Sequence, residues 1–178
     1  MFRKIMSFLF EALAVKQYLL FSASFFALSG FIMIATDNLV RPAGCPGIIP
    51  LELSFTKTAF NNIVSACGAT GVRSHIILIW IDYIFIFAYT GFLANLLGSL
   101  VRGIERGHAI AIFSLPVLAG FLDIIENTLI LTQLSSPENL SGIVIFTAST
   151  AALLKFLLLA ASIGLIIYYL FHAAKGKR

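Results

Sequence analysis

The feature that most constrains the fold is a set of four long apolar stretches separated by polar segments. Each has roughly 20 or more predominantly apolar residues, the length that an α-helix needs to cross a bilayer core of about 30 Å. Of the 178 residues, 60% are hydrophobic and 11% are charged, which is more apolar surface than a soluble domain of this size needs. The pattern predicts an all-α, polytopic membrane four-helix bundle. The expected spans are about residues 17–36, 74–101, 109–134 and 143–171.

The remaining segments fit around these spans as parts of a single membrane domain over residues 1–178. Residues 1–16 place apolar side chains at helical spacing with basic residues among them, which is typical of a short interfacial helix on the membrane surface. A cleaved secretory signal is the alternative. The apolar run from Tyr18 to Ala35 is long enough to span and lacks a convincing small-residue cleavage site, which favours an uncleaved anchor.

The one long connection covers residues 38–71. Prolines and glycines break its first half. Its second half, from Thr56 to about Cys67, has the apolar stripe of a short amphipathic helix on the outer side, with Thr56 as N-cap and Gly68 as stop. The two cysteines, Cys45 and Cys67, both lie in this connection and form no C-x-x-C motif, so a structural disulfide is an option if the loop is periplasmic.

Basic residues indicate the orientation. The chain has 12 Lys and Arg against 8 Asp and Glu, and the cations lie at span ends, so lipid head groups explain them better than nucleic acid. The positive-inside rule predicts a multi-pass protein of the cytoplasmic (inner) membrane with both termini in the cytoplasm. The predicted inner side has Arg3, Lys4, Lys16, Arg102, Arg106, Lys175, Lys177 and Arg178, and the outer side has Arg41, Lys57 and Arg73.

A group of polar residues interrupts the third span. Asp123, Glu126 and Asn127 stand at i, i+3 and i+4 and therefore project from one helix face. A charge at bilayer depth costs about 2.5–3.5 kcal/mol even on lenient insertion scales, so these groups are expected to face the protein interior or a wet cavity.

Other polar residues are expected at the same depth. Asp82 lies roughly 12 Å below the outer end of its span by the helical rise, Tyr89 shares its face, and Lys155 lies at or slightly below this layer. Glu52 is expected above the layer, at the outer boundary. The coincidence predicts a polar cavity in the outer half of the bundle, open to the outside.

These residues suggest acid–base or binding chemistry. Asp123, Glu126 and Asp82 are the predicted catalytic groups, because carboxyls with separated pKa values are a common means of acid–base catalysis. Their excess of negative charge calls for protonation or a bound cation. The alternative is a structural ion-pair network in which Lys155 answers Asp123 or Asp82. The predicted binding residues are Asn127, Tyr89, Lys155, Trp80, Glu52 and Tyr83, with interface or side-chain packing as the alternative for Trp80 and Tyr83.

No grouping of histidine and cysteine indicates zinc, so no metal site is predicted, although three carboxylates offer ligands for a hard cation. No cofactor is indicated.

Two resemblances involve the same residues. The segments Leu51–Thr56, Asp82-Tyr83-x-Phe85-x-x-x-Tyr89 and Leu118–Asn127 resemble a widespread group of uncharacterised four-span membrane proteins, over about residues 50–160. This resemblance implies the four-span fold and no activity. The site chemistry is also similar to that of EXPERA sterol-isomerase-like domains, whose buried acids bind cationic or carbocation-like sterols. That similarity implies this role for Glu126, Asp123, Asp82, Asn127 and Trp80.

The leading hypothesis is a cavity protein that binds or transforms a membrane lipid or another amphipathic small molecule by acid–base chemistry. The alternatives are a small proton- or cation-coupled carrier, for which a homo-oligomer is an option, and an assembly or structural subunit of the membrane. The sequence leaves open whether the protein is an enzyme.

Overall fold

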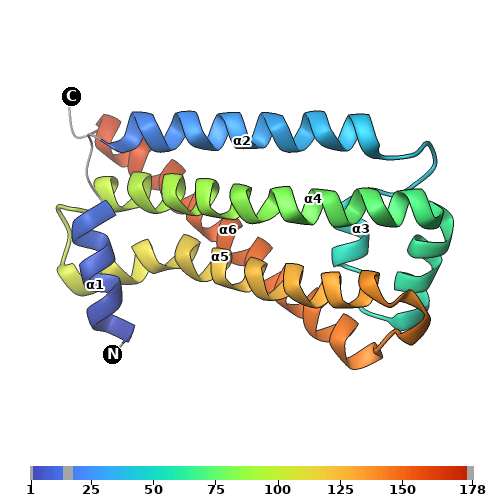
Figure 1. Cartoon of the computed structure of the whole chain (residues 1–178). Helices are drawn as coiled ribbons and strands as arrows, with labels where there is room; N and C mark the ends of the chain where they lie inside the picture. The colour runs from blue at the N-terminus through green and yellow to red at the C-terminus, as the bar shows by residue number, and fades with distance from the viewer. Residues whose placement is uncertain (1, 14–17, 176–178) are drawn as a thin grey trace.

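The computed structural model describes residues 2–13 and 18–175, and this part of the chain is all-α (Figure 1). Four helices are long and apolar enough to cross a membrane, by length and composition. The predicted four-span helical bundle is therefore confirmed. The elements are α1 (Phe2–Leu13), α2 (Leu19–Val40), α3 (Ile48–Glu52), α4 (Lys57–Leu100), α5 (Arg106–Ser135), the 3-10 turn η2 (Pro137–Asn139) and α6 (Gly142–Lys175).

Three helices form the centre of the bundle, because α5 packs extensively against both α4 and α6. Helix α2 lies on the outside along α4, away from α5 (Figure 1). Within α2 only Ser29 is buried, and bulky apolar side chains such as Leu20 and Phe31 are exposed. This distribution fits a helix whose outer face meets lipid rather than protein.

The predicted N-terminal helix is present as α1, which lies across one end of the bundle beside α4 and α5 (Figure 1). Met6 is buried, and the ring of Phe10 meets that of Phe113 edge-on at 5.5 Å. Part of the predicted segment, residues 14–16, lies outside the described residues.

The expected boundary between the amphipathic helix and the second span is different in the structure. Thr56 caps the helix as predicted, since its Oγ1 accepts a hydrogen bond from the Ala59 amide at 3.1 Å. Gly68 has a φ of 61° and a ψ of −175°, but the chain becomes helical again directly after it. Glycine tolerates this left-handed φ at little cost, so the backbone changes direction without a loop. The two expected elements are joined end to end in α4.

The first half of the long connection also contains a helix that the sequence analysis did not predict. Helix α3 includes Pro50, but this proline stands in the first turn, where its missing N–H leaves no helical bond unmade. Leu51 and Glu52 at the end of α3 are buried. The connection therefore folds inward instead of lying over the bundle as an irregular loop.

A disulfide between Cys45 and Cys67 ties this connection to α4, with 4.5 Å between the Cα atoms. Gly71 makes room for it, because a Cβ at this position would lie 3.0 Å from the Cys45 sulfur. His75, one turn later, donates from Nε2 to the Pro46 carbonyl at 3.1 Å. The structure thus contains the disulfide that the sequence left as an option, and it anchors the segment that leads into α3.

Candidate functional site

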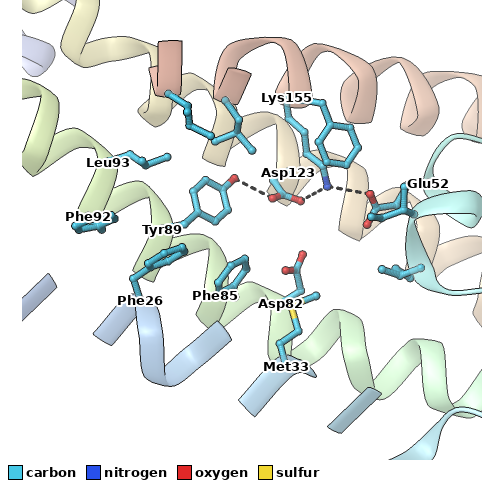
Figure 2. A pocket seen from close by; sticks show the side chains of 15 residues that line it. Phe26, Met33, Glu52, Asp82, Phe85, Tyr89, Phe92, Leu93, Asp123 and Lys155 are labelled. Atoms are coloured by element: carbon cyan, nitrogen blue, oxygen red, sulfur yellow. Dashed lines mark hydrogen bonds and ion pairs between the residues drawn. The ribbon is translucent and has the colours of Figure 1, made fainter. Parts of the chain in front are cut away.

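The centre of the candidate site is the ammonium group of Lys155 on α6, which is surrounded by carboxylates from two other helices. Nζ lies 2.8 Å from Asp123 Oδ1, 2.7 Å from Glu126 Oε2 and 3.3 Å from Glu52 Oε2. All four residues are buried, and Glu126 is fully inaccessible. Figure 2 shows Asp123 and Glu52 on either side of the Lys155 nitrogen. One lysine therefore connects α3, α5 and α6.

Helix periodicity explains how α5 reaches two neighbours at once. Asp123, Glu126 and Asn127 share its buried face, as the i, i+3, i+4 spacing predicts. Asp123 and Glu126 meet Lys155 on α6, while Asn127 donates from Nδ2 to Asp82 Oδ2 on α4 at 2.7 Å.

Helix α4 contributes a second contact to the network. Tyr89 lies seven residues after Asp82, on the same face, and its hydroxyl donates to Asp123 Oδ2 at 2.8 Å. The predicted common layer of Asp82, Asp123, Glu126 and Lys155 is thus present in the structure, and Lys155 pairs with Asp123, one of the two partners that the structural alternative offered it.

The position expected for Glu52 was wrong. It does not stand at the outer boundary but is 4% exposed and forms an ion pair with Lys155. The reason is α3, which turns inward and places its last residue inside the bundle. Burial raises the pKa of Glu52 above its ordinary value, and the positive charge of Lys155 opposes this rise only in part.

A cavity of about 510 Å³ lies beside this network, between α2, α3, α4 and α6. Its polar wall consists of the side chains labelled in Figure 2 as Glu52, Asp82, Tyr89, Asp123 and Lys155. The rest of the wall is apolar. It is made of Phe26, Met33, Ile48, Ile49, Phe85, Phe92, Leu93, Phe156, Leu159 and Ile163.

The cavity is amphipathic rather than polar throughout, which corrects the expectation of a polar cavity. Glu52 lies at one end, and Phe92 and Leu93 lie at the other (Figure 2). Asp82 and Leu93 are both on α4, and the helical rise over their separation is about 16 Å. Phe26 of α2 stacks on Phe92 at 5.2 Å and closes the apolar part.

The cavity reaches the surface of the bundle beside α3 and α6. Two of its lining side chains, Ile49 and Ile163, are 55% and 50% exposed. Helix α2, which forms the opposite wall, packs against α4 and has no comparable contact with α6 among the described residues. A side opening of this kind would face lipid chains in a membrane.

Hydrogen-bond acceptors outnumber donors in the site. An ammonium group can donate three hydrogen bonds. The Lys155 ammonium already has three carboxylate oxygens around it, one each from Glu52, Asp123 and Glu126. Within the described part of the chain, Glu126 Oε1 and Asn127 Oδ1 are buried with no hydrogen-bond partner. Four carboxyls against one ammonium would give a formal charge of −3 if all were ionised. The site is therefore short of protons or of a cation.

The structure does not bring every predicted site residue to the cavity. Trp80 is 63% exposed and its ring lies 5.6 Å from that of Tyr83. The Tyr83 hydroxyl lies 2.9 Å from Thr128 Oγ1, on the outer side of α5. Neither aromatic residue lines the cavity. Glu126 and Asn127 belong to the network but lie behind the polar wall.

Sequence reasoning missed the apolar half of the cavity. Its walls include Phe26, Phe92 and Phe156. Phenylalanine is common on helix surfaces that face lipid and on surfaces that pack against protein, and the spacing of these three residues does not distinguish either surface from a cavity wall. Only the arrangement of α2 and α6 around α4 identifies them as cavity walls.

The space between the carboxylates that a hard cation would need is filled by the Lys155 ammonium. Elsewhere in the described ranges, Cys45, Cys67 and His75 have potential metal-ligand atoms within 4.8 Å of one another. The two sulfurs are already bonded to each other.

No family model, no curated protein and no solved structure matches the chain. The resemblances drawn from the sequence stay predictions.

Proposed function

We propose that this membrane protein binds a lipid-like or amphipathic small molecule in the cavity between α2, α3, α4 and α6. The observation that supports the proposal is the division of the cavity into a carboxylate end and a long apolar end. An amphipathic molecule would place its polar head beside Asp82 and Asp123 and its apolar part along Phe92 and Leu159. Pockets with apolar walls and a few converging polar groups are typical of small-molecule sites.

The head group is one that donates hydrogen bonds. The donors that line the cavity are already engaged, since Tyr89 donates to Asp123 and Lys155 is surrounded by carboxylates. Asp82 accepts one hydrogen bond, from Asn127, and has acceptor capacity left for a ligand. An amine or a hydroxyl meets this requirement, whereas a phosphate or carboxylate head would face acceptors and negative charge.

We propose further that the site carries out acid–base chemistry on the bound head group. Asp123 accepts hydrogen bonds from Tyr89 and from Lys155 at the same time, so an exchangeable proton lies next to a carboxylate at the cavity wall. Such a pair can take a proton from a ligand and return it. Glu126 contacts Lys155 but not the cavity, so its part is to position the lysine.

The test uses three amphiphiles that share one alkyl chain: dodecylamine, dodecanol and dodecanoate. Native mass spectrometry of the detergent-purified protein measures how much of each is bound at equal concentration. We expect the amine to bind about tenfold more tightly than the carboxylate, a difference that one good charge-assisted contact can produce.

The matched variants are Asp82→Asn, which neutralises the cavity carboxyl, and Glu138→Gln, which neutralises an exposed carboxyl in η2. Asp82→Asn should lose the preference for the amine, and Glu138→Gln should keep it. Equal binding of all three amphiphiles, or tighter binding of dodecanoate, would contradict the proposed site.

A structural role is the second candidate, and one observation favours it: Lys155 joins three separate helices through buried ion pairs. Under this alternative the wild type binds none of the amphiphiles. Substitutions in the network would then change only the unfolding transition.

We infer further that the protein resides in the cytoplasmic membrane with both termini on the cytoplasmic side. The inference rests on the basic residues around α1 and the turn between α4 and α5, which the positive-inside rule assigns to the cytoplasm.

A further inference from the structure

A second hollow, separate from the cavity, lies where α1 meets the start of α5. It has a volume of about 690 Å³. Its lining combines charged and polar side chains: Arg3, Lys4 and Ser7 of α1, Glu105 immediately before α5, and Arg106, Gly107 and Ile110 of α5.

The charges in this hollow do not balance. Arg106 donates a hydrogen bond to Ser7 Oγ at 2.8 Å and forms an ion pair with the carboxylate of Glu11. The acid in the wall, Glu105, has a carboxylate oxygen 2.6 Å from His108 Nδ1, and this contact offsets the negative charge only when the imidazole is protonated. Arg3 and Lys4 have no ion-pair partner in the described part of the chain. With a neutral His108, these three cations face the two carboxylates of Glu105 and Glu11, which leaves one positive charge in excess around the hollow.

Arg3 is directed toward the hollow and not away from it. A Cβ built on Gly107 would lie 3.7 Å from Arg3 Nη2, so the guanidinium of α1 reaches over the first turn of α5. A planar guanidinium can bind two phosphate oxygens at once, and the Lys4 ammonium adds a point charge beside it.

The depth of the hollow matches the head-group region of a bilayer. Helix α1 lies at the end of the α4 and α5 spans (Figure 1). It packs Met6 and Phe10 against the bundle and exposes Ile5 and Phe8, which are 45% and 70% accessible. A helix with one apolar exposed face and basic residues beside it is typical of the membrane interface.

We propose that this hollow binds the phosphate-bearing head group of an anionic phospholipid from the surrounding bilayer. Arg3 and Lys4, which form no ion pair within the described residues, match a phosphodiester and favour an anionic lipid over a zwitterionic one. The site is independent of the cavity, whose carboxylates disfavour the same head group.

The test compares phosphatidylglycerol with phosphatidylcholine of the same acyl chains, bound to the full chain in detergent and counted by native mass spectrometry. The variant is Arg3→Gln with Lys4→Gln. The control is Lys57→Gln with Arg73→Gln, two exposed cations of α4 for which the described residues offer no ion pair. We expect the α1 variant to bind phosphatidylglycerol at least tenfold more weakly, because it lacks two basic residues that attract the anionic head group. The control should bind it like the wild type.

Equal retention of both lipids by the wild type, or equal losses in variant and control, would overturn the proposal. A third arm adds inorganic phosphate. Displacement of the lipid by millimolar phosphate would show that a free anion, and not a lipid head group, is the ligand. If the double variant unfolds in detergent, the single variant Lys4→Gln carries the comparison, with a smaller expected loss.

Discussion

Lys155 is the residue on which the buried network depends, because within the described part of the chain it is the one cation that pairs with these carboxylates. The members of this network that lie within the four spans were predictable from the sequence, since a charge inside an apolar span needs a buried partner. The place of Glu52 was not predictable, because it depends on α3, a helix hidden among prolines and glycines.

Replacing Lys155 by methionine keeps a side chain of similar length and removes the charge. Buried carboxyls would then lose their counter-ion, which typically costs about 3–5 kcal/mol. We expect a marked fall in the midpoint of thermal unfolding in detergent. Lys57→Met, at an exposed position, is the control. An equal shift of the unfolding midpoint in the two variants would show that the buried ion pairs of Lys155 do not stabilise the fold.

Glu52 offers a test through pH. Its pKa is raised in the folded state, so the folded protein binds more protons than the unfolded chain as pH increases above the ordinary value near 4.5. Stability from this group is therefore present at lower pH and is lost as pH rises toward the folded pKa. Glu52→Gln should make the decline of unfolding midpoint with pH shallower. An unchanged slope would contradict the buried position of this carboxyl.

At the scale of elements, the cavity depends on α2 and α3, which supply two of its walls. The four spans were predictable because hydropathy reports them directly. The junction at Gly68 was not, since the same glycine that ends a helix can also redirect one. The apolar wall was not predictable, because a phenylalanine that faces a cavity, such as Phe26, and one that faces lipid look alike in the sequence.

The disulfide provides an element-scale prediction. Cys45→Ser with Cys67→Ser removes the link between α4 and the segment before α3, and loss of a cross-link typically costs about 2–4 kcal/mol. We expect a lower unfolding midpoint, and weaker amine binding because Glu52 is less well held. Differential scanning fluorimetry and the dodecylamine assay measure the two effects. If the variant is destabilised but folded and still binds dodecylamine with wild-type affinity, then α3 does not contribute to the ligand site.

At the scale of the whole molecule, the even number of spans places α1 and the end of α6 at the same end of the bundle (Figure 1). This arrangement agrees with the orientation inferred from the basic residues. We expect a cysteine introduced at Lys57 to react with a membrane-impermeant maleimide in intact cells, while one at His108 reacts only after lysis. The native pair is bonded and does not compete. Labelling of His108→Cys in intact cells would reverse the orientation.

The most direct test of the central claim asks what the cavity holds in the cell. Wild type, Asp82→Asn and Glu138→Gln are purified gently and compared by native mass spectrometry with lipid extraction. We expect wild type and Glu138→Gln to retain the same small amphiphile with an amine or hydroxyl head, and folded Asp82→Asn to lack it. Three equally stable proteins with no bound amphiphile, or an anionic lipid retained equally in all three, would contradict it.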